Sequence, residues 1–413
     1  MKIAVVGSGI SGMTAAHLLS RRHEVHLFEA QTRLGGHTHT HDIELDGESV
    51  VVDSGFIVYN DRTYPNFQKL LAQLGVAGRK SQMSFSVSCE RTGLEYAGSN
   101  LNALFAQRRN LLHPGFLNML REILRFNRQL RGQVGQLEEW QSVGDYLQSN
   151  GYSRRFLEHY IVPMTAAIWS ATHQRVLEFP LEFFARFFLN HGLLDLANRP
   201  QWYVIDGGSR TYIEPLTAPY AEQIYRYAAV RSVLRNEVGV RLQFADGHSQ
   251  CYDHVVLACH SDQALALLDR PTSAEQAILS AIPYQANSAV LHTDERLLPK
   301  SRTAWAAWNY HVTGDDQPAA LTYNMNLLQG IESRHTFCVT LNHDDAIDTD
   351  RVLRRMNYDH PVFTVAGERA KADYAEINHR NQTSYCGAYW GNGFHEDGVN
   401  SALAVAASFG IEL

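Results

Sequence analysis

The chain has 413 residues, of which 45% are hydrophobic and 19% charged, so it can bury a large core and is long enough for more than one domain. Its 36 Lys and Arg residues against 43 Asp and Glu residues leave a formal charge of -7, which argues against the basic footprint of a duplex nucleic-acid-binding protein. Five cysteines, an odd number without close pairs, favour a reducing compartment over a disulfide framework, and we expect a cytoplasmic protein.

The first predicted element is a strand, Lys2 to Val6, a short run rich in β-branched residues. A GxGxxG motif follows it directly, with Gly7, Gly9 and Gly12. A pyrophosphate must approach the main chain there more closely than a Cβ atom allows. Gly7 permits the turn, Gly9 the approach, and Gly12 the close packing of helix on strand. We therefore expect a dinucleotide at the N-terminus of the following helix.

A second predicted strand, Val25 to Phe28, ends on Glu29, which lies 20 residues after Gly9. At that distance an acidic side chain meets the hydroxyl pair of a ribose, and it favours an adenosine ribose without a 2′-phosphate. The strand, the helix, the second strand and the acid agree with one another. The sequence therefore predicts a Rossmann-type dinucleotide site, although the motif alone does not choose between FAD and NAD.

The segment that follows distinguishes the two dinucleotides. Residues 29–37, EAQTRLGGH, resemble the second signature of the flavin amine oxidase superfamily, in which an arginine and a glycine pair follow an acid. The resemblance implies that Arg33, Gly35 and Gly36 contact the pyrophosphate and ribityl region of FAD. It also implies that His37 takes the place of a basic residue found there in other members. An arginine fork suits phosphate oxygens, and glycines allow a second loop to lie against the cofactor.

The resemblance continues to the C-terminus. Residues 385–388 and 391–399 match the strand, loop and helix start that close on the flavin in the superfamily, and residues 229–233 match the strand that meets the adenine. Backbone N–H groups at such a helix start stabilise negative charge on a reduced flavin. The cofactor-binding residues implied in this way are Gly7, Gly9, Ile10, Ser11, Gly12, Glu29, Ala30, Arg33, Gly35, Gly36, His37, Thr38, Val230, Gly387, Asp397, Gly398 and Val399.

The resemblance covers the whole chain and implies an α/β fold. Its core would be a Rossmann-type FAD-binding domain, as in amine oxidases and phytoene desaturases, with an inserted α+β substrate domain. We expect the FAD-binding domain to comprise residues 1–75, 200–270 and 370–413. Residues 76–199 and 271–369 would form the substrate or cap domain, and the first of these two insertions is strongly helical by pattern.

One branch of the superfamily is resembled most closely, the amine oxidase-like FAD proteins that accompany cyclopropane fatty acid synthases. Residues 35–40, 53–60, 63–66, 305–310 and 395–398 carry this closer resemblance. It implies a small-molecule or lipid substrate with acyl chains, and a lipid methyltransferase as partner. This implication is an analogy between families and does not come from side-chain chemistry.

A helical pattern between residues 116 and 131 combines an apolar face with a basic one. The apolar face carries Phe116, Leu120, Ile123, Leu124 and Leu130, and the arginines mostly opposite it are Arg121, Arg125, Arg128 and Arg131. One interpretation is core packing with a solvated basic face. The other is peripheral contact with an anionic membrane. No apolar run approaches the ~18 residues needed to cross a bilayer.

Candidates for catalytic residues are few. Tyr385 and Trp390 could form an aromatic wall near the flavin, and His292 could act as an acid or base, although core packing is the simpler interpretation of all three. In amine oxidases of the superfamily a lysine in the second insertion holds a water beside the flavin. The comparable residues 285–292 contain no lysine, which argues against amine oxidation.

Three histidines, His37, His39 and His41, alternate with threonines and would share one face of a strand. Imidazoles in that arrangement could bind a metal. Metal sites usually draw their ligands from separate segments, and this run lies where FAD is expected, so we expect no metal.

Three functions remain open on the sequence. The first is hydride transfer from an apolar, fatty-acyl substrate to flavin N5, giving a desaturation or oxidation. The second is oxidation of an amine or polyamine. The third is a flavin-bearing partner of a lipid methyltransferase with little turnover of its own. An apolar tunnel would favour the first and an acid-lined pocket the second.

Overall fold

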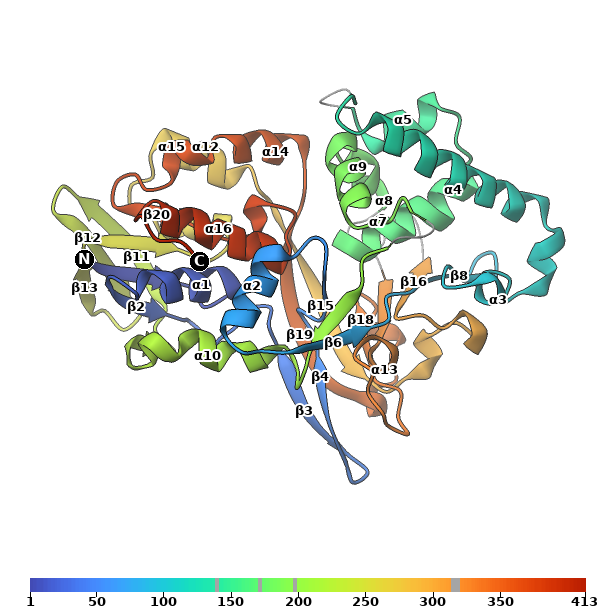
Figure 1. Ribbon diagram of the computed structural model, residues 1–413, viewed down its shortest axis with the longest axis horizontal. Helices are drawn as coiled ribbons and strands as arrows, with labels where there is room; N and C mark the ends of the chain where they lie inside the picture. The colour runs from blue at the N-terminus through green and yellow to red at the C-terminus, as the bar shows by residue number, and fades with distance from the viewer. Residues whose placement is uncertain (138–140, 170–172, 196–198, 313–319) are drawn as a thin grey trace.

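The computed structural model describes residues 1–137, 141–169, 173–195, 199–312 and 320–413. Figure 1 shows two halves side by side. The left half surrounds a parallel sheet and holds both termini, and the right half joins a mixed sheet to a group of helices. The predicted α/β fold with an inserted α+β part is confirmed.

The first half is built on a five-stranded parallel sheet in the order β10-β2-β1-β14-β20. Its strands are β1 (Lys2–Val6), β2 (Glu24–Phe28), β10 (Ile224–Tyr225), β14 (His254–Leu257) and β20 (Thr383–Tyr385). Alternate residues of β1 face opposite cores: Ile3 and Val5 lie in one apolar cluster, and Ala4 and Val6 lie in another. Both faces of the sheet are buried, which explains the continuous apolar run at the start of the sequence.

Helices α1 (Ile10–Leu19) and α16 (His395–Ala407) pack together on the first of these faces. A three-stranded antiparallel sheet, β11 (Val230–Asn236), β12 (Gly239–Phe244) and β13 (Ser249–Tyr252), packs on the other. The remaining helices of this half are α2 (Pro65–Gln73), α10 (Ile213–Thr217), α11 (Ser261–Leu267), α12 (Ser273–Ser280), α14 (Val365–Ala372) and α15 (Tyr374–Ile377).

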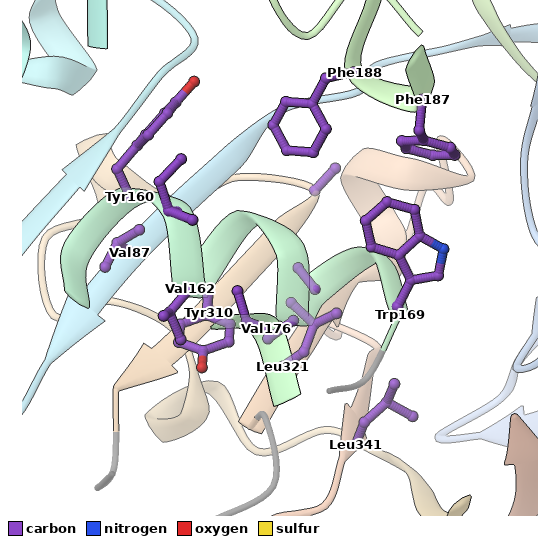
Figure 2. Close-up of a cluster of buried hydrophobic side chains, with 14 of the residues drawn as sticks. Val87, Tyr160, Val162, Trp169, Val176, Phe187, Phe188, Tyr310, Leu321 and Leu341 are labelled. Carbon is purple, nitrogen blue, oxygen red and sulfur yellow. The ribbon is translucent and has the colours of Figure 1, made fainter. Parts of the chain in front are cut away.

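The second half, the cap, contains a seven-stranded mixed sheet in the order β19-β15-β18-β17-β16-β7-β8. Its strands are β7 (Phe85–Cys89), β8 (Leu94–Ala97), β15 (Tyr284–His292), β16 (Trp308–Val312), β17 (Ala320–Asn324), β18 (Cys338–Leu341) and β19 (Val352–Pro361). The cap helices are α3 (Leu101–Leu104), α4 (Pro114–Gln133), α5 (Val143–Ser149), α6 (Arg154–Phe156), α7 (Val162–Trp169), α8 (His173–Glu178), α9 (Leu181–Asn190) and α13 (Met325–Leu328). Figure 2 shows Val162 and Trp169 of α7 in one apolar cluster with Tyr310 and Leu321 of the sheet.

Two smaller sheets lie between the halves. They are the hairpin of β3 (Thr40–Leu45) and β4 (Glu48–Asp53), and the sheet β5-β9-β6, formed by β5 (Tyr59–Asn60), β6 (Gly78–Ser81) and β9 (Trp202–Ile205). Among the described residues, no helix combines the length and apolar character needed to cross a membrane.

The strand β7 corrects one expectation, because its segment was assigned to a mainly helical insertion. Residues Phe85 to Cys89 alternate apolar and serine residues, which is the period of a strand. Pairing with β16 places the segment in the cap sheet. The boundaries proposed for the FAD-binding domain, 1–75, 200–270 and 370–413, stay a prediction.

Candidate active site

Three glycines shape the turn between β1 and α1, for different reasons. Gly7 has a φ of +106°, and a Cβ atom on Gly12 would lie 2.0 Å from the carbonyl oxygen of Gly7. Both positions therefore require glycine for the fold itself. A Cβ atom on Gly9 would meet no protein atom within 4 Å, and Gly9 borders a cavity. Gly9 thus leaves room for a ligand.

Glu29 follows β2 at the edge of the same cavity. Its carboxylate accepts hydrogen bonds from the N–H (3.1 Å) and the hydroxyl (2.6 Å) of Ser8, and from the N–H of Gln31 (2.8 Å). These bonds hold the acid beside the glycine turn, where the sequence predicts a ribose. Ala30 and Val230 border the cavity as well.

A second glycine loop lies against the first. The N–H of Gly35 donates to the carbonyl of Ser8 at 3.0 Å, and a Cβ atom on Gly36 would lie 3.0 Å from the Cα of Gly9. Gly35 and Gly36 have φ values of +110° and +58°. Glycine lets the two loops meet here with their main chains facing the cavity.

Arg33 closes this second loop instead of facing the cavity. Its guanidinium donates to the carbonyls of Leu34 (3.2 Å), Gly36 (2.7 Å) and Thr38 (2.5 Å). Arg33 is not among the residues that border the cavity. Three main-chain acceptors hold the guanidinium in this structure, and the contact of Arg33 with a pyrophosphate stays a prediction.

Thr38 forms a buried polar cluster with Tyr212 and His395 behind the loop. Nε2 of His395 lies 3.0 Å from the Thr38 hydroxyl and 3.1 Å from the Tyr212 hydroxyl, and the two hydroxyls contact each other. The ring of His395 stacks on Phe56 with centroids 3.4 Å apart, and both side chains border the cavity. Burial lowers the pKa of His395 to about 3, so the imidazole is neutral near pH 7.

Gly398, in the first turn of α16, serves helix packing. A Cβ atom there would lie 2.7 Å from Cγ2 of Ile10 and 2.9 Å from the hydroxyl oxygen of Ser11. The glycine allows α16 to approach α1 closely. Ile10 and Ser11 themselves border the cavity, as the sequence predicts for cofactor-binding residues.

Asp397 and Val399 do not border the cavity, and their contacts with the cofactor stay predictions. The Asp397 carboxylate accepts the N–H of Phe394 at 2.9 Å and caps α16, and Val399 is fully buried in the core. Burial raises the pKa of Asp397 to about 6. Phe394, which precedes the helix, does border the cavity.

One cavity of about 700 Å³ runs from the glycine turn to the cap. At the parallel sheet it is bordered by the glycines Gly7, Gly9, Gly35, Gly36 and Gly387. At the cap it is bordered by aromatic and aliphatic side chains: Ile168, Trp169, Trp308, Tyr323, Leu328 and Leu341. Among the described residues, the carboxylates at its border are Glu29 and the exposed Asp359 of β19. None of the five lysines borders it.

His37 follows the second glycine loop and lies in the wall of the cavity. Its ring centroid is 5.4 Å from that of His360 and 6.3 Å from that of His260. Burial, together with these neighbouring imidazoles, lowers the pKa of His37 well below its ordinary value. Its Nε2 atom is buried without a hydrogen-bond partner in the described part of the chain. A bound ligand would supply that partner, and with the open space at Gly9 this arrangement fits a dinucleotide.

The other two histidines of the run lie apart from His37. His39 contacts the hydroxyl of Tyr358 at 3.1 Å, and His41 contacts the hydroxyl of Ser54 at 2.8 Å. Within the described ranges, no three His, Cys, Asp or Glu side chains are grouped so that they could hold a metal ion.

The three candidate catalytic residues lie away from the cavity wall. The Tyr385 hydroxyl donates to Glu275 at 2.7 Å, Trp390 packs on Tyr374 with ring centroids 4.5 Å apart, and His292 is fully buried in the cap sheet. Each side chain is held by packing or by an internal hydrogen bond, and the roles proposed for them near the flavin stay predictions.

Several residues at the cavity were not predicted from the sequence, among them Trp169, Tyr358, His360 and Tyr389. They come from α7, from β19 and from the loop after β20. No motif or spacing connects these segments, so the sequence holds no local signal for their convergence. The sequence indicates an aromatic wall in the loop after β20, with Trp390 as its member. In the structure Tyr389 borders the cavity and Trp390 does not.

Comparisons with known proteins agree with this geometry. The sequence profile of the flavin containing amine oxidoreductase family matches residues 10–349. The flavin-dependent L-tryptophan oxidase RebO of Lentzea aerocolonigenes is 44% identical over 55 residues, which span 13% of this chain and 12% of that curated relative.

Two solved structures share the fold over nearly the full length. A mutant of putrescine oxidase superposes with a TM-score of 0.72 at 15% identity, covering 98% of each chain. A fatty acid isomerase from P. acnes that produces CLA superposes with a TM-score of 0.70 at 14% identity, again covering 98% of each chain.

Proposed function

The chain belongs to the flavin containing amine oxidoreductase family and so uses a flavin cofactor, and we propose that it is an FAD-dependent oxidoreductase that removes a hydride from an apolar, acyl-chain substrate. The observation that supports this substrate class is the aromatic and aliphatic wall at the cap end of the cavity. A bound flavin supplies the hydride acceptor there.

The residues of the chain have separate tasks in this proposal. The N–H groups at the start of α1, bared by Gly9, bind the phosphates, and Glu29 meets the adenosine ribose. Val230 borders the adenine end, and His37 and His395 offer neutral imidazoles to the cofactor. The apolar wall excludes water and orients a chain of methylene groups.

An amine is a poorer fit to this wall. A cationic ammonium group needs an acid to offset the loss of its hydration. Glu29 lies with the glycine turn, and Asp359 is exposed on β19. The cap side chains Ile168, Leu328 and Leu341 offer no such acid, whereas a hydrocarbon chain gains free energy by contact with them.

We further infer that the acyl chain belongs to a lipid that a cyclopropane fatty acid synthase or related methyltransferase handles, and that the protein works in the cytoplasm. The first inference is supported by the resemblance of residues 35–40, 53–60 and 395–398 to proteins that accompany those synthases. The second is supported by five free cysteines.

The test is an anaerobic titration of the purified yellow protein, followed at the flavin absorption band. We expect fatty-acyl lipids to bleach the band and putrescine or L-tryptophan to leave it unchanged. Bleaching by amines alone would overturn the substrate class. If neither class bleaches the band, the acyl-chain substrate is wrong, and the result supports the alternative of a flavin-bearing partner of a lipid enzyme.

A charge placed in the wall sharpens the same test. Ile168→Glu is expected to slow bleaching by lipid at least about tenfold, because burying a carboxylate next to a hydrocarbon chain is unfavourable. Ile123→Glu is the matched control, since Ile123 is half-buried in α4 and does not border the cavity. Equal rates for the two variants would show that the substrate does not contact this wall.

A further inference from the structure

The cap exposes leucines at one end of the molecule. Leu101 is 76% exposed, Leu111 48%, Leu112 87% and Leu124 51%. Every leucine that is exposed in the described part of the chain lies in this segment. Isolated exposed leucines need no explanation, but these four lie within 24 residues of chain on three consecutive elements.

These leucines lie on three consecutive elements, α3, a 3-10 helix (Arg108–Leu112) and α4. A hydrogen bond from Arg108 to Asn102 joins the first two. In α4, Phe116, Met119 and Phe126 point into the core, while Arg121, Leu124 and Arg128 are exposed at the spacing of one helix face. Figure 1 places α3 and α4 at the end of the long axis opposite the N-terminus.

The same segment is strongly basic. Residues 96–137 contain six arginines and one acid, although the chain as a whole has a formal charge of -7. The arginines are Arg108, Arg109, Arg121, Arg125, Arg128 and Arg131. The acid, Glu122, is 8% exposed, and its carboxylate accepts hydrogen bonds from the N–H and the hydroxyl of Ser153. It therefore contributes little negative charge to the surface.

Most of these arginines have no carboxylate partner. Arg131 pairs with Asp195. Arg109 donates to the carbonyl of Gly93, and Arg125 lies over the ring of Tyr152, 4.0 Å from its centroid. Across the described ranges, no ion pair is formed by Arg108, Arg109, Arg121, Arg125 or Arg128. The segment therefore presents positive charge beside exposed leucines.

We propose that this leucine–arginine surface, formed by the four leucines and the exposed Arg108, Arg109, Arg121 and Arg128, docks the protein on an anionic lipid bilayer. The leucines enter the boundary between headgroups and acyl chains, and the arginines contact lipid phosphates. An acidic protein partner is a weaker fit, because leucine is under-represented among the residues that carry most of the energy of protein–protein contacts, and the apolar residues here are all leucines. The inference does not depend on the substrate proposed for the cavity.

The experiment is sedimentation of the yellow holoprotein with lipid vesicles. We expect binding to vesicles of phosphatidylcholine mixed with phosphatidylglycerol, much weaker binding to pure phosphatidylcholine, and release at high salt. Failure to bind the anionic vesicles, or equal binding to both kinds, overturns the proposal. If the surface binds an acidic protein instead of a bilayer, the protein should fail to bind the anionic vesicles.

Two double variants separate the apolar and the charged contribution. Leu111→Ser with Leu112→Ser is expected to weaken binding at least about tenfold. Arg121→Gln with Arg128→Gln is expected to weaken it about fivefold for each charge removed. Flavin content and thermal unfolding temperature of both should equal those of the wild type, since the four side chains are exposed.

Matched controls lie in the other half of the molecule. Val238→Ser removes a side chain that is 92% exposed, and Arg241→Gln with Arg270→Gln removes two exposed charges. Both controls should bind anionic vesicles as the wild type does. Equal losses in the controls and in the cap variants would show that the surface is not the docking site.

Discussion

The end of the cavity at the parallel sheet is bordered largely by main chain, whereas the end at the cap is bordered by side chains. Gly9, Gly35 and Gly36 present main chain to the cavity, and their roles follow from local conformation. Trp169 and Leu341 contribute bulk from distant segments. The comparison teaches that the cofactor end tolerates few substitutions, while the substrate end can change its specificity without changing the fold.

The largest expected effect tests the claim that some glycines serve the fold. Gly12→Val should destabilise the protein by more than about 3 kcal/mol and yield little soluble yellow protein, because the Cβ atom would lie 2.0 Å from a carbonyl oxygen. Urea-induced unfolding measures the change in the free energy of unfolding. The control is Gly132→Ala in α4, where a Cβ atom meets nothing within 4 Å and the helix should gain up to about 1 kcal/mol.

The next effect concerns pH and the cap sheet. Burial lowers the pKa of His292 to about 4, so the folded protein keeps this imidazole neutral while the unfolded chain binds a proton near pH 6.5. Above about pH 6.5 neither state binds this proton, so His292 does not lower the free energy of unfolding. As the pH falls from about 6.5 toward about 4, proton binding by the unfolded chain lowers the free energy of unfolding by about 1.4 kcal/mol per pH unit. His292→Gln should lessen the slope of the unfolding free energy against pH in this window by that amount, as measured by urea unfolding at a series of pH values.

A smaller effect separates cofactor binding from folding. Gly9→Ala should unfold at the same urea concentration as the wild type when both are stripped of FAD, because the added Cβ atom meets no protein atom within 4 Å. FAD should bind roughly 10- to 100-fold more weakly, since the side chain occupies space at the turn. Fluorescence titration with FAD measures this. Unchanged affinity would place the cofactor elsewhere.

The smallest effect tests the role of Tyr385. Tyr385→Phe removes the hydroxyl that donates to Glu275, a buried acid that also pairs with Arg235. Stability should fall by about 1 kcal/mol, the usual contribution of such a bond. The rate of flavin bleaching should stay the same, because the side chain does not border the cavity. A large fall in rate at unchanged stability would restore Tyr385 as a candidate near the flavin.

Much of the cofactor end was predictable, because its signals are local. The strand from Lys2, the glycine turn and Glu29 lie within 30 residues of one another, and the structure brings them to one cavity. The sequence does not show how Arg33, Asp397 and Val399 are held in the fold, and their contacts with the cofactor stay predictions. Residue type alone does not tell whether a guanidinium donates to a ligand or to a nearby carbonyl, or whether an acid caps a helix.

The sequence by itself determined the α/β fold and the dinucleotide turn, since strand periodicity, glycine conformations and the spacing to Glu29 depend on neighbours along the chain. Tertiary structure alone decided which side chains form the apolar wall and which arginines remain unpaired. Trp169, Tyr323 and Leu341 meet because α7, β17 and β18 pack in the cap. Contacts between residues so far apart in the chain follow from packing of whole elements, and no local pattern encodes them.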